Sequence, residues 1–202
     1  MRRYIVRHRG FLLIAAFLAV AAFSAIVARE VEDNPGNNHS GIFASHVEAY
    51  FSPGGKCTKV IVAEINAAKA TIYLQAYSFT SAPIAKALVD AHKRGVKVTA
   101  LLDQSNRTQK YSSADFLAHA GIETYIDSKH AIAHNKIIIV DGVSVITGSF
   151  NFSKAAEDKN AENVVVIRDS RIAATYEQNW WSHFEHSEAY ASDPSRSAGS
   201  LE

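Results

Sequence analysis

The segment His134-Asn135-Lys136 places an imidazole close to an ammonium group. In an extended strand alternate side chains share a face, so His134 and Lys136 point the same way and Asn135 points the other way. Imidazole is a competent nucleophile and acid near neutral pH, and a lysine stabilises negative charge that builds on substrate oxygens. The pair therefore suits a displacement reaction in which a substrate becomes more negative as it reacts.

The residues after Lys136 predict a hairpin that returns the chain toward His134. Residues 136–140 and 143–147 are apolar runs separated by Asp141-Gly142, the composition of a two-residue turn. Asp141 has odd parity relative to His134 and lies at the first turn position. Because aspartate is common in such turns, we interpret Asp141 as a structural residue of the motif and not as a catalytic one.

A second polar segment follows the returning strand. Ser149 and Asn151 share parity, and the hairpin brings both back toward His134. Gly148 stands beside them, and we expect it to permit close approach of a ligand to the backbone. The amide of Asn151 and the hydroxyl of Ser149 are hydrogen-bond donors suited to substrate oxygens.

The spacing of these two segments resembles a known signature. The combined patterns are His134-x-Lys136-x4-Asp141 and Gly148-Ser149-x-Asn151. Together they resemble the HKD signature of the phospholipase D superfamily, and they are most similar to its small bacterial nucleases with a single motif. Two further segments fit that subgroup, namely Glu162-Asn163 and Tyr50-Phe51-Ser52-Pro53. The resemblance covers most of residues 47–184.

The resemblance implies a two-step displacement at phosphorus. His134 would attack to form a phosphohistidine, and the histidine of a second motif would protonate the leaving oxygen. Lys136, Ser149 and Asn151 would bind the phosphate oxygens. Glu162 would accept a hydrogen bond from the other ring nitrogen of His134 and fix its tautomer. The route requires no metal and no cofactor.

The number of motifs predicts a homodimer. Larger members of the superfamily carry two HKD motifs in one chain, whereas no other histidine here is followed by x-Lys. The other histidines are His8, His39, His46, His92, His119, His130, His183 and His186. A second half-site must then come from another chain, and a two-fold dimer supplies an identical patch to itself.

Hydrophobic periodicity predicts an α/β fold. Strands at 47–51, 71–77, 96–102 and 122–126 alternate with helices at 58–69, 82–94 and 113–120. After the hairpin, a strand at 163–167 precedes a long helix at 170–190. Alternation of this kind predicts parallel pairs. We therefore expect a mixed, largely parallel sheet flanked by helices, the fold that the resemblance to single-HKD phospholipase D-like proteins also implies.

The amino-terminal region predicts export. Residues 1–28 contain four arginines, no acid and an apolar run at 11–28, which is typical of a signal peptide, with small-x-small cleavage sites ending at Ala21 and Ala28. An uncleaved anchor is the alternative, since eighteen helical residues span roughly 27 Å. Both place the protein outside a bacterial cytoplasm, either periplasmic or secreted or anchored in the membrane.

The remaining boundaries follow from composition. Residues 29–41 lack periodicity and predict a linker, residues 42–191 the catalytic domain, and residues 192–202 a disordered tail. Residues 29–202 contain 17 basic against 20 acidic residues, so a nucleic acid partner would need a local basic patch. Cys57 is the single cysteine, and we expect it to be buried.

Other residues with chemical potential are interpreted as structural. His119 and His130 lack a spaced cluster of partners of the kind that zinc requires, so we expect them to be surface or loop residues and no metal site to form. Helical spacing places Trp180 in the core and leaves Trp181 as a candidate contact residue.

Three functions remain open at this level. The leading hypothesis is a non-specific, metal-independent endonuclease that cleaves DNA, with RNA as a further substrate. The first alternative is a lipid phosphodiesterase acting on cardiolipin or phosphatidylcholine, which an uncleaved anchor would favour. The lesser alternative is a dimer that binds phosphate groups without catalysis.

Overall fold

The computed structural model describes residues 46–109 and 112–191. The predicted signal segment or anchor at 1–28, the linker at 29–41 and the tail at 192–202 lie outside these residues. Among the described residues, no helix is both long enough and apolar enough to span a membrane.

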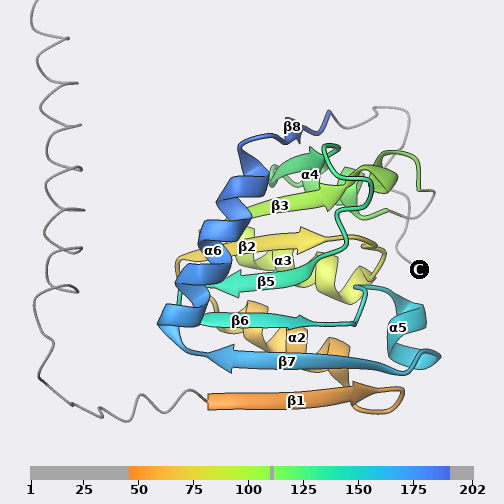
Figure 1. Ribbon diagram of the computed structural model, residues 1–202, viewed down its shortest axis with the longest axis vertical. Coiled ribbons are helices and arrows are strands. Elements are labelled where there is room, and N and C mark those ends of the chain that lie inside the picture. The colour runs from red at the N-terminus through yellow and green to blue at the C-terminus, as the bar shows by residue number, and fades with distance from the viewer. Residues whose placement is uncertain (1–45, 110–111, 192–202) are drawn as a thin grey trace, which may run out of the picture. The chain divides into compact units, whose positions relative to one another are not determined.

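Within the described residues, one sheet contains eight strands in the order β1-β7-β6-β5-β2-β3-β4-β8 (Figure 1). The strands are β1 (His46–Ser52), β2 (Thr71–Ala76), β3 (Lys97–Asp103), β4 (Glu123–Asp127), β5 (Lys136–Val140), β6 (Ser144–Gly148), β7 (Glu162–Arg168) and β8 (Glu188–Ala189). Strand β3 pairs in parallel with both β2 and β4, and all other pairings are antiparallel.

The predicted mixed α/β fold is confirmed, but the expectation of a largely parallel sheet is wrong. Helix crossovers give parallel strands only between β2, β3 and β4. From β5 onward the chain runs as a meander through β6 and β7, which requires antiparallel neighbours, and β1 closes the sheet against β7 in the same sense.

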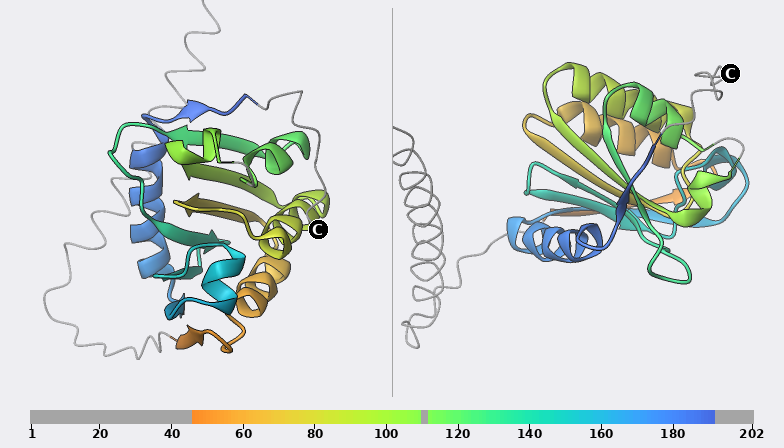
Figure 2. Two further views of the ribbon diagram at one scale, coloured as in Figure 1. Left: turned by 90° about the vertical axis from the view of Figure 1, so that its right-hand side faces the viewer. Right: turned by 90° about the horizontal axis from the view of Figure 1, so that it is seen from above.

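Helices cover both faces of the sheet (Figure 2). On one face lie α2 (Cys57–Ala67), α3 (Ala82–Lys93) and α4 (Ala114–His119), and α6 (Ser170–Phe184) crosses the other. Two short elements, η1 (Gln104–Arg107) and α5 (Lys154–Asp158), were not predicted. In α5 the hydroxyl of Ser153 accepts a hydrogen bond from the Ala156 backbone N–H at 3.2 Å, a capping contact that the sequence signals only weakly.

Alternate residues of the central strands supply two hydrophobic clusters. Ile72 and Leu74 of β2 face the larger cluster under α2 and α3, and the predicted buried Cys57 lies there too. Tyr73 faces the smaller cluster under α6 with Trp180, whose indole N–H donates to the Leu74 carbonyl at 3.0 Å. Because both faces are covered, β5 is apolar at nearly every position.

Two predicted boundaries need correction. The helix expected at 170–190 ends at Phe184, because Glu188–Ala189 pairs with β4 instead. The Ser187 hydroxyl donates to the His183 carbonyl at 2.8 Å where the chain leaves the helix. The hairpin is confirmed, but Val140 pairs with Ser144, so three residues connect the strands and not two.

Candidate active site

The predicted site residues gather at one edge of the sheet, where β2 and β6 end and β5 and β7 begin (Figure 1). His134 precedes β5 by two residues, Ser149 and Asn151 follow β6, and Glu162 opens β7. These strand ends share an edge because β5 is antiparallel to β2 and β6, and β6 is antiparallel to β7. We call this group, together with Lys136, the motif edge.

The loop that carries His134 is tied to the sheet on both sides of that residue. The Ala133 backbone N–H donates to the buried Asp103 carboxylate at 2.7 Å, and the Asn135 carbonyl accepts from the Tyr77 backbone N–H at 2.9 Å. The His134 side chain is exposed, and its ring centroid lies 4.7 Å from that of Tyr77. The backbone is thus held in place while the imidazole stays open to solvent.

Lys136 lies next to the backbone of His134. Its side chain is almost fully buried, its ammonium donates to the His134 carbonyl at 2.6 Å, and it lies 5.1 Å from the centroid of the Tyr77 ring. Burial lowers the pKa of the Lys136 ammonium below its ordinary value, and the nearby carboxylate of Glu162 opposes that effect. The structure thereby places one cation against the backbone of the residue that carries the candidate nucleophile.

Glu162 affects the site through its charge on Lys136 and makes no hydrogen bond to His134 among the described residues. It accepts a hydrogen bond from the Asn160 side-chain amide at 3.1 Å, and its charge acts on Lys136. In the described residues of the single chain, no hydrogen bond joins Glu162 to His134. The orienting role that the resemblance implies for Glu162 therefore stays a prediction.

Ser149 and Gly148 are both held against β7. The Ser149 hydroxyl accepts hydrogen bonds from the backbone N–H and the side-chain amide of Asn163, at 3.1 and 3.2 Å. Its own proton remains available to a substrate oxygen. Gly148 has a φ of 146°, and a Cβ there would meet the Asn163 carbonyl oxygen at 2.2 Å. The close approach that requires glycine is thus to a neighbouring strand, and the expectation that Gly148 also permits approach of a ligand stays a prediction.

Asn151 carries an unsatisfied polar group. Its Oδ1 atom is buried and has no hydrogen-bond partner among the described residues. Buried polar atoms in native proteins are nearly always paired, so an orphan in a candidate site indicates a missing partner. A half-turn of the amide would bring the NH2 group to the same place, where it can donate to a phosphate oxygen.

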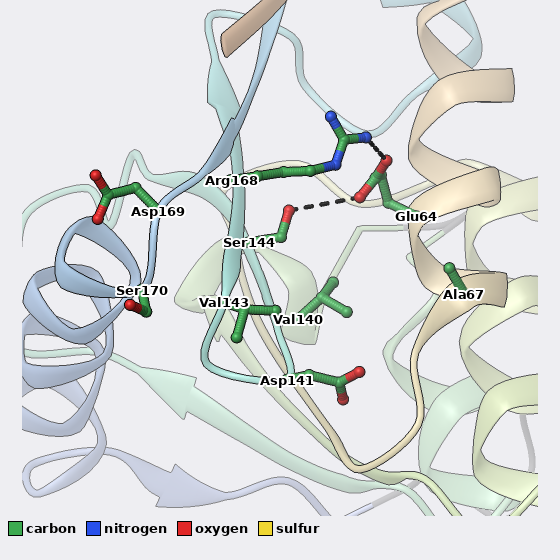
Figure 3. Close-up of a pocket in the computed structure, with 9 residues that line it drawn as sticks. All are labelled: Glu64, Ala67, Val140, Asp141, Val143, Ser144, Arg168, Asp169 and Ser170. Atoms are coloured by element: carbon green, nitrogen blue, oxygen red, sulfur yellow. Dashed lines mark hydrogen bonds and ion pairs between the residues drawn. The ribbon is translucent and has the colours of Figure 1, made fainter. Parts of the chain in front are cut away.

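Asp141 lies at the other end of β5 from His134, beside a cavity of about 420 Å³ (Figure 3). Its carboxylate accepts three backbone N–H bonds, from Lys69, Ala70 and Thr71, at 2.8 to 2.9 Å. Burial alone would raise the pKa of Asp141, but these three donors outweigh it and hold the pKa below its ordinary value. Asp141 is therefore a structural carboxylate that lines this cavity, and the cavity is separate from the motif edge.

Sequence reasoning missed two features. Tyr77 packs against His134 and beneath Lys136, and its position at the end of a predicted strand was the only signal for it. The statement that His130 lacks a partner cluster is wrong, because Asp127, His183 and His186 surround it. The expectation for His119 is consistent with the structure, where it is exposed at the end of α4.

Comparison with known proteins agrees with the motif. Residues 61–184 match the protein family described as "Cardiolipin synthase, PLD-like domain". A protein named "Phospholipase D" from Rickettsia felis is 49% identical over 143 residues, which are 71% of this chain and 72% of the relative. The "Mitochondrial cardiolipin hydrolase" of Chlamydomonas reinhardtii is 29% identical over 60% of this chain and 56% of its own length.

A solved structure also matches the fold. The phospholipase D family member Nuc from Salmonella typhimurium aligns with a TM-score of 0.71 and 41% identity, over 73% of this chain and 99% of that chain. The family match covers more than half of the chain, and the histidine and lysine of the HKD motif meet at one sheet edge. The chain therefore belongs to the phospholipase D superfamily and is a phosphodiester hydrolase.

Proposed function

We propose that the chain is a non-specific endonuclease that cleaves DNA, and RNA as a further substrate, through a phosphohistidine on His134, without a metal ion. The observation that carries the proposal is the exposed imidazole of His134, whose backbone carbonyl accepts a hydrogen bond from the buried ammonium of Lys136, at one edge of the sheet. The side-chain amide of Asn151, whose buried Oδ1 atom has no hydrogen-bond partner among the described residues, adds a third group suited to a phosphodiester.

The chemistry divides into two displacements. In the first, a neutral His134 ring nitrogen bonds to phosphorus, the bond to the leaving oxygen breaks, and a second histidine donates a proton to that oxygen. In the second, water bonds to phosphorus, gives its proton to the second histidine, and the bond between phosphorus and His134 breaks. Lys136, Ser149 and Asn151 stabilise the charge on the non-bridging oxygens in both steps.

The second histidine is assigned to a second copy of the chain. His134-x-Lys136 is the single motif of this kind in the sequence, and an isologous dimer would bring the two copies of His134 together. Phe51, which is 64% exposed at the end of β1, and Ile132, which is 56% exposed in the loop before His134, offer apolar surface near this edge. The proposed homodimer therefore forms across the motif edge.

The proposed location is outside the cytoplasm, because residues 11–28 have the pattern of an export signal. In the host this corresponds to a periplasmic or secreted enzyme, and retention of the segment would anchor it to the membrane.

A lipid phosphodiesterase is the second candidate. Its support is the name "Phospholipase D" of a relative that is 49% identical over 71% of this chain. Cardiolipin and phosphatidylcholine also contain phosphodiesters, so the same displacement applies. The third hypothesis is a dimer that binds phosphate groups without catalysis. Membership of a family of hydrolases argues against it.

The test uses the full-length chain in excess chelator with two substrates in parallel. We expect supercoiled plasmid DNA to be nicked and vesicles of cardiolipin and phosphatidylcholine to remain intact. The His134→Asn variant should nick no DNA, and His119→Asn, an exposed histidine outside the motif edge, should behave like wild type. Hydrolysis of vesicles with intact plasmid would replace the nuclease proposal with the lipid alternative.

A further inference from the structure

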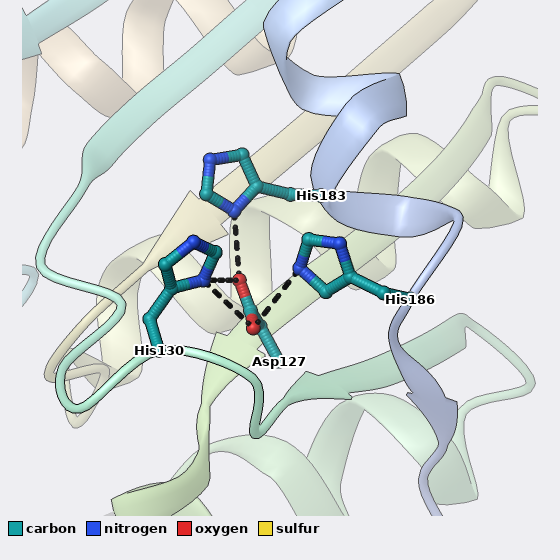
Figure 4. A group of neighbouring side chains, drawn as sticks. All are labelled: Asp127, His130, His183 and His186. Atoms are coloured by element: carbon teal, nitrogen blue, oxygen red, sulfur yellow. Dashed lines mark hydrogen bonds and ion pairs between the residues drawn. The ribbon is translucent and has the colours of Figure 1, made fainter.

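Four side chains outside the motif edge converge on one point (Figure 4). Asp127 ends β4, and His130 lies three residues later in the loop before β5. His183 lies in the last turn of α6, and His186 lies in the turn that follows the helix. One potential ligand atom from each residue lies within 4.8 Å of every other. We call these four residues the aspartate–histidine cluster.

The distances from the Asp127 carboxylate to the three imidazoles are close to those between the ligands of a tetrahedral metal ion. The Asp127 carboxylate oxygens lie 3.2 Å from His130 Nδ1, 2.8 Å from His183 Nδ1 and 3.3 Å from His186 Nε2. Zinc binds nitrogen and oxygen ligands at about 2.0–2.1 Å, so two ligands on a tetrahedral ion are about 3.3 Å apart. Each histidine nitrogen thus already lies at nearly the distance from a carboxylate oxygen of Asp127 that one shared zinc ion requires.

The three imidazole rings give an independent check. A ring centroid lies about 1.1 Å beyond the ligating nitrogen, so two imidazoles on a tetrahedral zinc have centroids about 5.2 Å apart. The observed separations are 4.8 Å for His130 and His183, 5.3 Å for His130 and His186, and 5.5 Å for His183 and His186. The rings surround a common centre as ligands do.

Hydrogen bonding alone leaves the cluster unsatisfied. His130 and His183 pair with the carboxylate through hydrogen bonds, but the buried Nε2 atom of His186 makes none with suitable geometry. A buried ring nitrogen without a partner is costly, whereas a bound cation would satisfy its lone pair. The polar groups are therefore better matched to an ion than to one another.

Charge and sequence spacing also favour a cation. Asp127 is fully buried, and His183 occupies the last turn of α6, where the helix dipole favours positive charge. The ligands come as two short pairs, Asp127-x-x-His130 and His183-x-x-His186, the arrangement by which structural zinc sites join two chain segments. Packing of Phe184 on Tyr125, with centroids 4.6 Å apart, holds the two segments together.

We propose that Asp127, His130, His183 and His186 bind one zinc ion. Four protein ligands leave no open coordination position, so the site is structural and takes no part in phosphodiester cleavage. The ion clamps the end of α6 to β4 and holds the start of the loop, residues 128–135, whose other end carries His134. This inference concerns groups distinct from the motif edge and does not depend on the proposed substrate.

The test measures zinc uptake by the full-length chain after metal removal. We expect one zinc per chain by elemental analysis, and an unfolding temperature about 5–10 °C higher at a zinc concentration 100-fold above Kd. Cobalt(II) should give the strong visible absorption of a tetrahedral ion.

The variants separate ligation from folding. The side chain of His130 is 44% exposed, so His130→Asn should fold normally and weaken zinc binding by more than about 100-fold, as should His183→Gln. His119→Asn and His134→Asn should bind zinc like wild type, although the latter should lose turnover. Equal zinc affinity of wild type and a correctly folded His130→Asn would overturn the proposal, as would a wild-type unfolding temperature that zinc does not change.

Discussion

The motif edge and the aspartate–histidine cluster lie at opposite ends of one loop, residues 128–135, yet they are built differently. At the motif edge an exposed histidine stands beside a buried cation, with Lys136 donating to the His134 carbonyl. In the cluster three histidines surround a buried anion, Asp127. The first arrangement leaves a nucleophile open to a substrate, whereas the second encloses its donor atoms.

The electrostatics of the two regions are opposite as well. Burial lowers the pKa of Lys136, with Glu162 opposing it. For Asp127 burial acts to raise the pKa, but hydrogen bonds from His183 and His130 outweigh it and keep the pKa below its ordinary value. We infer that the motif edge serves catalysis and that the aspartate–histidine cluster serves stability. Each prediction below tests this difference between the two regions.

The largest expected effect is the loss of turnover in His134→Ala. Removing the imidazole eliminates the nucleophile and, in a dimer, the acid, so turnover should fall by at least about 10⁴-fold in single-turnover assays. Since His134 is exposed, the free energy of unfolding should change by less than about 0.5 kcal/mol. If the variant kept activity within tenfold of wild type, His134 would not be the catalytic nucleophile.

The Asp127→Asn variant should show the opposite pattern. Because it removes the anion at the centre of three histidines, the free energy of unfolding in urea should fall by about 2–4 kcal/mol, with turnover reduced by less than about tenfold. Asp90→Asn, which breaks an exposed pair with Lys86, is the matched control and should leave the free energy of unfolding almost unchanged.

The pH dependence sharpens this comparison. The folded pKa of Asp127 lies below its ordinary value of 3.8, so its stabilising contribution is complete above that pH and is lost as pH falls through the folded pKa. The stability difference between wild type and Asp127→Asn should therefore shrink below about pH 3.8. If this stability difference stayed constant into strong acid, the charge of the Asp127 carboxylate would not be the source of the stabilisation.

Mixed subunits test the shared active site with a smaller effect. If each site needs two copies of His134, a dimer with one His134→Asn subunit is inactive. After full subunit exchange at equal concentrations, activity should be about one quarter of the wild-type value, against about one half for independent sites. Native mass spectrometry verifies the exchange. A linear fall with the fraction of wild-type subunits would contradict the two-histidine mechanism.

The smallest expected change is that of activity in excess chelator. Turnover should stay within about twofold of its value in zinc, because the phosphohistidine route needs no metal. The unfolding temperature should meanwhile drop to that of the metal-free chain. If chelator abolished turnover and zinc restored it, the aspartate–histidine cluster would be needed for catalysis. That result would contradict the separate roles proposed here for the cluster and the motif edge.

Much of the fold could be predicted because its signals are local. The alternation of strands and helices through residue 127, the hairpin around Asp141 and the burial of Cys57 and Trp180 all follow from periodicity and turn composition. The order of the strands could not, since it depends on which apolar faces pack together. For the same reason a strand was missed at Glu188–Ala189, where pairing with β4 and not local propensity ends the helix.

The sequence by itself determined the chemical identity of the motif edge. His134 and Lys136 are two residues apart, and Ser149 and Asn151 follow one hairpin later, so the hairpin brings the two segments to one edge. Only the tertiary structure decided the role of Gly148, which accommodates Asn163 of the adjoining strand. It also assembled the aspartate–histidine cluster, because its two halves lie more than fifty residues apart and meet only when α6 packs across the end of β4.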